Sequence, residues 1–132
     1  MSESYVAMQT VMMPRDANPQ GTIFGGVILS LIDMGAHTAA KRFVVQAGGP
    51  PPVLVTVAIN RVEFKQPVFV GDVVRCVVSL VKFGNTSMTV KVTIEADRGL
   101  ETFVVTEAEV VFVGIDNTTP HRKPKALFPK EA

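Results

Sequence analysis

Residues 24–40 read FGGVILSLIDMGAHTAA, an apolar run whose only formally charged residue is Asp33. The run predicts a helix from about residue 25 to residue 46, which ends at the breaker GGPPP of residues 48–52. A helix that is apolar nearly all round belongs in the centre of a fold. In a chain of 132 residues, something large must therefore wrap around it.

The rest of the sequence supplies strands for this wrapping. Residues 4–13 predict a first strand, and residues 53–64, 73–83, 87–96 and 102–114 predict the others. The run 87–96 alternates strictly between polar and apolar side chains, as in a half-buried strand of an antiparallel sheet. We therefore expect an α+β fold, in which a curved antiparallel five-stranded sheet wraps around one long central helix.

Length and composition fit a single domain over residues 1–132. With 47% hydrophobic and 19% charged residues, the chain can build a core of its own. Residues from about 116 to 132 read as a polar, basic C-terminal tail. The net charge of +1 gives no support for nucleic acid as a partner.

We expect no membrane span and no secretion signal. Lys41 and Arg42 cut the apolar run short of the about 20 residues that a spanning helix needs. The first residues, MSESYVAMQT, lack the basic and apolar regions of a signal peptide. The single Cys76 cannot form an internal disulfide, which suits a reducing compartment. A cytoplasmic location is the resulting expectation.

Asp33 is the first candidate for chemistry. A carboxylate on an apolar helix is costly to bury, because desolvation disfavours its ionised form. Asp33 is therefore either a catalytic group or a structural group bonded to a nearby backbone or hydroxyl group. The residues before it, N18-P-Q-G-T-I-F-G-G26, favour catalysis. Glycines let a ligand approach the backbone, and the first N–H groups of a helix can polarise a carbonyl oxygen.

The spacing of these groups constrains the site. Asp33 follows Gly26 by seven residues, about 10 Å along a helix axis. One substrate atom cannot meet both groups within one chain. Either the substrate spans the gap, or two copies of the helix pair and each supplies half of a site.

Several other classes of site are not supported. The sequence contains no GxxxxGK[ST] loop, no GxGxxG after a strand and no GxSxG elbow. His37, Cys76 and His121 do not have the spacing of metal ligands, so no metal is expected.

The stretch NPQGTIFGGVILSLIDMGA, residues 18–36, closely resembles the hotdog-fold acyl-CoA thioesterases of the YciA-type and cytosolic brain-type branch. Shorter matches are FKQPVFVGD at 64–72, KFGNTS at 82–87 and TEAEVVFV at 106–113. The resemblance covers about residues 8–128. It implies a hotdog fold that hydrolyses acyl-CoA to free fatty acid and coenzyme A, with no cofactor beyond the coenzyme A of the substrate.

The resemblance also implies an assembly and a set of roles. Two sheets join edge to edge in a homodimer, which is the minimum unit of a hexamer built as a trimer of dimers. The active site lies at the dimer interface. Asp33 acts as general base or nucleophile, and Asn18 of the facing subunit positions the water or the thioester. The backbone N–H near Gly26 polarises the thioester carbonyl.

Further residues are candidates for binding the substrate. Phe24, Phe64 and Met34 are candidates for an acyl pocket, although apolar residues at such places are more often core. Gly25, at the start of the helix, is a further candidate for binding the substrate. The nucleotide end of coenzyme A is expected at a turn and at basic residues that offer N–H groups, hydroxyls and positive charge. These residues are Lys82, Gly84, Asn85, Thr86, Ser87, Arg122, Lys123 and Lys125. An ordinary hairpin turn and a solvated tail would explain the same residues.

Two other functions stay open. A hotdog 3-hydroxyacyl dehydratase would need a histidine, which the loop before the helix lacks. A non-catalytic acyl-CoA sensor would not need the carboxylate of Asp33. His37, one turn after Asp33, offers a possible acid–base partner, but a bonded core or interface histidine is the preferred interpretation.

Overall fold

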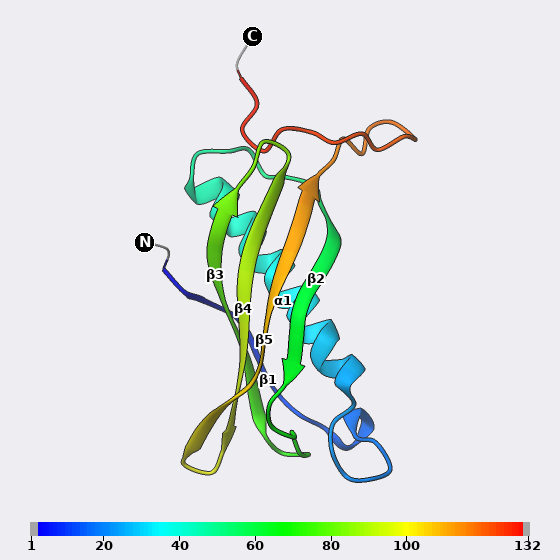
Figure 1. The fold of residues 1–132 in the computed structure, drawn as a ribbon, viewed down its shortest axis with the longest axis vertical. Helices are drawn as coiled ribbons and strands as arrows, with labels where there is room; N and C mark the ends of the chain where they lie inside the picture. Colours follow the sequence, from blue (N-terminus) through cyan, green and yellow to red (C-terminus); the bar gives the residue numbers. More distant parts are fainter. Residues whose placement is uncertain (1–2, 131–132) are drawn as a thin grey trace.

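The computed structural model describes residues 3–130, so residues 1–2 and 131–132 of the predicted domain and its tail lie outside the described residues. A short 3-10 turn, η1 (Pro14–Asp16), precedes one long helix, α1 (Gly25–Gln46), as Figure 1 shows. The strands are β1 (Tyr5–Val11), β2 (Leu54–Phe64), β3 (Val73–Phe83), β4 (Ser87–Arg98) and β5 (Glu101–Gly114). The predicted helix and all predicted strands are confirmed, with small shifts at the strand ends.

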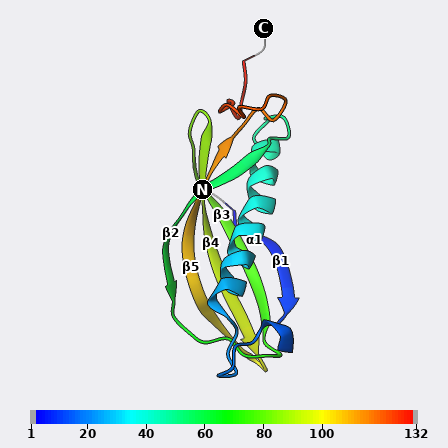
Figure 2. The ribbon, with the colours of Figure 1, turned by 90° about the vertical axis from the view of Figure 1, so that its right-hand side faces the viewer.

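The strands form one antiparallel sheet in the order β1-β3-β4-β5-β2. The sheet is curved, and α1 lies along one of its faces (Figures 1 and 2). The predicted α+β hotdog arrangement is therefore confirmed. β1 and β2 are the edge strands, so each has one backbone edge without a neighbouring strand of this sheet.

Alternation along the strands determines which side chains pack against α1. In β4, every second residue from Met88 to Ala96 is buried, as predicted. In β3, Cys76 packs so close to α1 that a Cβ at Gly35 would overlap its sulfur. Burial raises the pKa of the Cys76 thiol to about 12, so the thiol stays protonated and unreactive.

The sheet of one chain buries only one face of α1. That face comprises Ile28, Leu31, Ile32, Gly35, Ala36, Ala39, Ala40, Phe43 and Val44. The other face exposes apolar side chains, among them Leu29, Met34 and Val45. The expected wrapping of α1 is therefore incomplete within a single chain. Among residues 3–130, no helix combines the length and the hydropathy that crossing a membrane requires.

The C-terminal tail is less solvated than the sequence suggested. Leu127 is 2% exposed, and the Phe128 ring meets Phe83 edge-on with centroids 4.9 Å apart. The Leu127 N–H donates to the Asn85 carbonyl at 3.0 Å, and the Lys125 N–H donates to the carbonyl of Gly114, at the end of β5, at 2.8 Å. The tail is thus anchored beside the turn that joins β3 to β4.

Candidate active site

The glycine-rich start of α1 leaves backbone N–H groups open to a ligand. The Phe24 carbonyl accepts hydrogen bonds from the N–H groups of Val27 at 3.0 Å and Ile28 at 3.4 Å. The earlier N–H groups, those of Gly25 and Gly26, have no partner inside the helix. A Cβ at Gly26 would meet no heavy atom within 4 Å, so the backbone there can be approached closely.

Asn18 shapes the loop that leads into α1. Its Oδ1 accepts hydrogen bonds from the N–H groups of Gln20 at 3.0 Å and Thr22 at 3.2 Å. Its Nδ2 donates to the Thr22 hydroxyl at 2.8 Å. Both ends of the amide are therefore bonded within the loop. The expected role of Asn18 in positioning water or thioester stays a prediction.

Asp33 lies on α1 beside the edge strand β2. The Thr56 hydroxyl donates to Asp33 Oδ1 at 2.6 Å, a charge-assisted bond that orients the carboxylate. The expectation of a buried carboxylate needs correction, because Asp33 is only half-buried in one chain. The reason is that β2 is the last strand of the sheet and the open face of α1 begins beside it.

Sequence reasoning missed Thr56. Residue 56 lies in the valine-rich segment VLVTVAI, residues 53–59. Alternation along the strand places Thr56 on the same face as the buried Leu54, turned toward α1. A single hydroxyl on the inward side of an apolar strand is the signal that would have identified it.

Asp33 opens into a surface pocket of about 370 Å³, lined by Asp33, Met34, His37, Thr38 and Thr56. We call it the Asp33 pocket. The His37 ring packs edge-on against the buried Phe112, with centroids 5.8 Å apart. This contact supports the interpretation of His37 as a packed histidine. The part of the chain that the structure describes contains no cluster of three or more His, Cys, Asp or Glu suited to a metal ion.

A second pocket, of about 220 Å³, adjoins the start of α1 and is called the Phe64 pocket here. Its lining includes Gly25 and Ile28 of α1 on one side, and Phe64 with residues 65–68 on the other. A Cβ at Gly25 would lie 3.5 Å from the Phe64 ring, so this ring faces the start of α1 across the space that a side chain at residue 25 would fill. Phe24 is 49% exposed and does not line this pocket.

The residues predicted for the nucleotide end lie at the opposite end of the sheet from the start of α1 (Figure 1). Residues 84–86 form the turn between β3 and β4, where the Gly84 N–H donates to the Ser87 carbonyl at 2.7 Å. The tail brings Lys125 beside this turn, and Arg122 and Lys123 precede it in an exposed loop. One chain therefore does not bring these residues together with Asp33.

Comparison with known proteins agrees with this fold. Residues 20–103 match the Thioesterase superfamily. The acyl-CoA thioester hydrolase YciA of Escherichia coli is 34% identical to the chain over 127 residues, which are 92% of this chain and 89% of YciA. The chain is also similar to a hexameric thioesterase of Yersinia pestis, with a TM-score of 0.83 at 30% identity over 96% of this chain and 97% of the other.

A further solved relative is HI0827, a hexameric broad-specificity acyl-coenzyme A thioesterase. Its TM-score is 0.81 at 34% identity, over 99% of this chain and 85% of HI0827. The sequence motif, the strand order and these matches agree with one another. The chain therefore belongs to the thioesterase superfamily and has the hotdog fold.

Proposed function

We propose that the protein hydrolyses acyl-CoA thioesters to free fatty acid and coenzyme A, with Asp33 as the catalytic carboxylate. The observation that carries the proposal is the Asp33 carboxylate, which the Thr56 hydroxyl holds at 2.6 Å in a surface pocket and which is the one formal charge of residues 24–40. The activities for which YciA and HI0827 are named support it. We expect no cofactor beyond the coenzyme A of the substrate, and a cytoplasmic location that suits the free Cys76.

The spacing along α1 favours a site shared by two copies of the chain. Asp33 and Gly26 are about 10 Å apart along the helix axis. Two α1 helices that run antiparallel and cross at Leu29 and Ser30, midway between these positions, bring Asp33 level with Gly26 of the partner subunit. Leu29 and Ser30 both lie on the open face of α1. The pairing thus covers the apolar face that one sheet leaves open.

The edge strand β2 offers the matching backbone contact. In the sheet formed by residues 3–130, β2 pairs with β5 alone, so its outer edge offers N–H and C=O groups to another strand. Val55 and Val57 of β2 are 36% and 55% exposed, which is a high exposure for strand valines. Two β2 strands paired antiparallel would join the sheets and place both α1 helices on the same side. We propose this homodimer as the minimum unit of a hexamer built as a trimer of dimers.

In the shared site, Asp33 either takes a proton from an attacking water or attacks the thioester carbonyl itself. The N–H groups of Gly25 and Gly26 of the partner subunit donate to the oxygen that gains negative charge. The C–S bond then breaks, and coenzyme A leaves as a thiolate that takes up a proton. If water attacks, this step releases the fatty acid directly. If Asp33 attacks, the acyl group stays on Asp33 as an anhydride, which a water molecule hydrolyses to release the fatty acid and restore the carboxylate. Asn18 positions the water or the thioester beside these N–H groups, while Thr56 holds Asp33 in its orientation.

The substrate ends have separate places in this proposal. The acyl chain enters the Phe64 pocket beside Gly25, and the exposed Phe24 lies outside the lining of this pocket. Antiparallel pairing brings the turn between β3 and β4 of one chain to the same end as the start of α1 of the other. The nucleotide is bound there by backbone N–H groups, hydroxyls and cations of Lys82, Gly84, Asn85, Thr86, Ser87, Arg122, Lys123 and Lys125.

Asp33→Asn tests the proposed function directly. The substitution keeps the size of the side chain and an acceptor for the Thr56 hydroxyl, but removes the proton acceptor. We expect kcat for acyl-CoA to fall about 10²–10⁴-fold, with coenzyme A binding and oligomeric state unchanged. A variant that keeps more than about a tenth of the wild-type kcat would show that Asp33 is not the catalytic carboxylate. A wild-type protein that binds acyl-CoA without cleaving it would be a sensor instead.

Thr56→Val tests the orientation of the carboxylate. The valine keeps the shape of threonine but cannot donate to Asp33, so kcat should fall about tenfold, because a hydrogen bond to a charged group is worth about 1.5 kcal/mol or more. Thr38→Val is the matched control, since the Thr38 hydroxyl lines the same pocket but donates to the Met34 carbonyl at 3.0 Å. Steady-state kinetics that are equal in the two variants would contradict this role.

The basic tail is tested with two substrates. Alanine at Arg122, Lys123 or Lys125 should raise KM for acyl-CoA and leave kcat nearly unchanged, because phosphate contacts lie far from the thioester. The same variants should show little defect with an acyl-pantetheine, which lacks the nucleotide. Lys130→Ala, beyond the anchored Leu127, is the control and should leave KM unchanged. Equal defects with both substrates would mean that the tail serves assembly and not coenzyme A binding.

A further inference from the structure

Asp72 and Arg98 tie the loop between β2 and β3 (residues 65–72) to the end of β4. Arg98 Nε donates to Asp72 Oδ1 at 3.0 Å, and Arg98 Nη2 donates to Oδ2 at 2.8 Å. Asp72 is 3% exposed, and its Oδ2 also accepts the Phe69 N–H at 2.9 Å. The hydrogen bonds from Arg98 hold the pKa of the Asp72 carboxyl below its usual range, so the pair remains ionised.

Arg98 is fixed by more than this carboxylate. Its guanidinium lies over the ring of Phe69, 4.4 Å from the centroid, and over the ring of Phe103, 4.8 Å from the centroid. Nη2 also donates to the Pro67 carbonyl at 3.3 Å. A planar guanidinium that lies over two aromatic rings and donates hydrogen bonds from both Nε and Nη2 has little freedom to move. One side chain therefore holds the loop at Pro67, Phe69 and Asp72.

The same loop is paired with the residues that lead into α1. The Ile23 N–H donates to the Val68 carbonyl at 2.8 Å, and Thr22 and Phe69 form a β-bridge. Two residues after Ile23, α1 begins at Gly25. Residues 65–68 of the loop also line the Phe64 pocket. A displacement of the loop would therefore move both the wall of this pocket and the first N–H groups of α1.

We propose that Arg98 is a positioning residue for thioester hydrolysis. It acts through the 65–72 loop on the start of α1 and on the Phe64 pocket. The inference rests on the proposed function. Arg98 itself lines neither the Asp33 pocket nor the Phe64 pocket, so its effect on catalysis passes through Pro67, Phe69 and Asp72.

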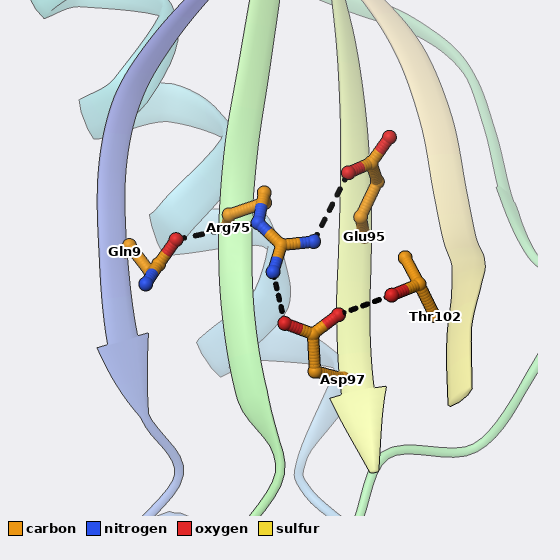
Figure 3. Close-up of polar contacts among 5 residues, drawn as sticks. All are labelled: Gln9, Arg75, Glu95, Asp97 and Thr102. Atoms are coloured by element: carbon orange, nitrogen blue, oxygen red, sulfur yellow. Dashed lines mark hydrogen bonds and ion pairs between the residues drawn. The ribbon is translucent and has the colours of Figure 1, made fainter. Parts of the chain in front are cut away.

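Arg75 provides a matched control (Figure 3). Its Nη1 donates to Glu95 at 3.1 Å, its Nη2 pairs with Asp97, and its Nε donates to Gln9 at 3.3 Å. The neighbouring Cys76 faces α1, so Arg75 lies on the other face of the sheet. Its side chain is 17% exposed, against 42% for that of Arg98. Loss of Arg75 should therefore lower the stability of the protein at least as much as loss of Arg98 does, but should leave the position of the 65–72 loop unchanged.

The test compares Arg98→Met with Arg75→Met on acetyl-CoA and octanoyl-CoA. We expect Arg98→Met to lower kcat about tenfold or more on both substrates, since a displacement of about 1 Å can cost a hundredfold. It should raise KM more for octanoyl-CoA, whose chain reaches further into the pocket. The kcat of Arg98→Lys should lie between those of wild type and Arg98→Met, because lysine keeps the positive charge but cannot donate two parallel hydrogen bonds to Asp72. Arg75→Met should lower Tm and keep wild-type kcat and KM.

Wild-type kcat and KM in Arg98→Met would overturn the proposal, and so would equal losses in Arg98→Met and Arg75→Met. If Arg98→Met does not form the wild-type oligomer, the kinetics of Arg98→Lys test the proposal instead. A lowered kcat in Arg98→Lys at wild-type Tm supports the proposal, whereas wild-type kinetics overturn it. A wild-type protein that cleaves neither substrate would refute the proposed function itself, which distinguishes the two failures.

Discussion

Helix α1 has apolar side chains on two faces, and the sheet of one chain covers only one of them. On the covered face, Gly35 lets α1 approach Cys76 of β3 with no side chain between them. On the open face, Met34 is 53% exposed within one chain. Exposed apolar surface of this kind favours burial against another surface. A second α1, brought by the free edge of β2, would supply that cover.

The position of Asp33 follows from this constraint. It lies at the boundary between the two faces of α1, where Thr56 of the edge strand can donate to its carboxylate. A carboxylate deeper in the core would be costly to ionise, and one on a fully exposed face would be surrounded by water. At the boundary, Asp33 stays oriented by one hydroxyl, and in the proposed dimer a substrate held between two chains would displace water from it.

Local signals predicted most of the fold. The apolar run ended by Gly48, Gly49 and Pro50 predicted α1, and the alternation of residues 87–96 predicted β4 with its buried face. Asp33 and the glycines before it became candidates for the same reason, since an isolated charge and a Gly-Gly pair can be read directly from neighbouring residues. The hotdog fold itself followed from these elements and from the family resemblance.

Contacts between distant segments could not be read in this way. Thr56 meets Asp33 across 23 residues, and Arg98 meets Asp72 across 26. The burial of Leu127 depends on where the turn at Asn85 lies, which the composition of the tail does not reveal. Asp33 was expected to be buried because the sequence suggested complete wrapping of α1, whereas one chain wraps only half of it.

In the proposed dimer, each site combines Asn18 of one chain with Asp33 of its neighbour. Asn18→Ala and Asp33→Asn, each of which we expect to be inactive alone, can be mixed under conditions in which subunits exchange. A mixed dimer has one site with both wild-type residues and one with neither, so complete exchange should restore about a quarter of wild-type activity. Mass spectrometry can show that subunits have exchanged. If activity does not recover once exchange is complete, the shared site is contradicted.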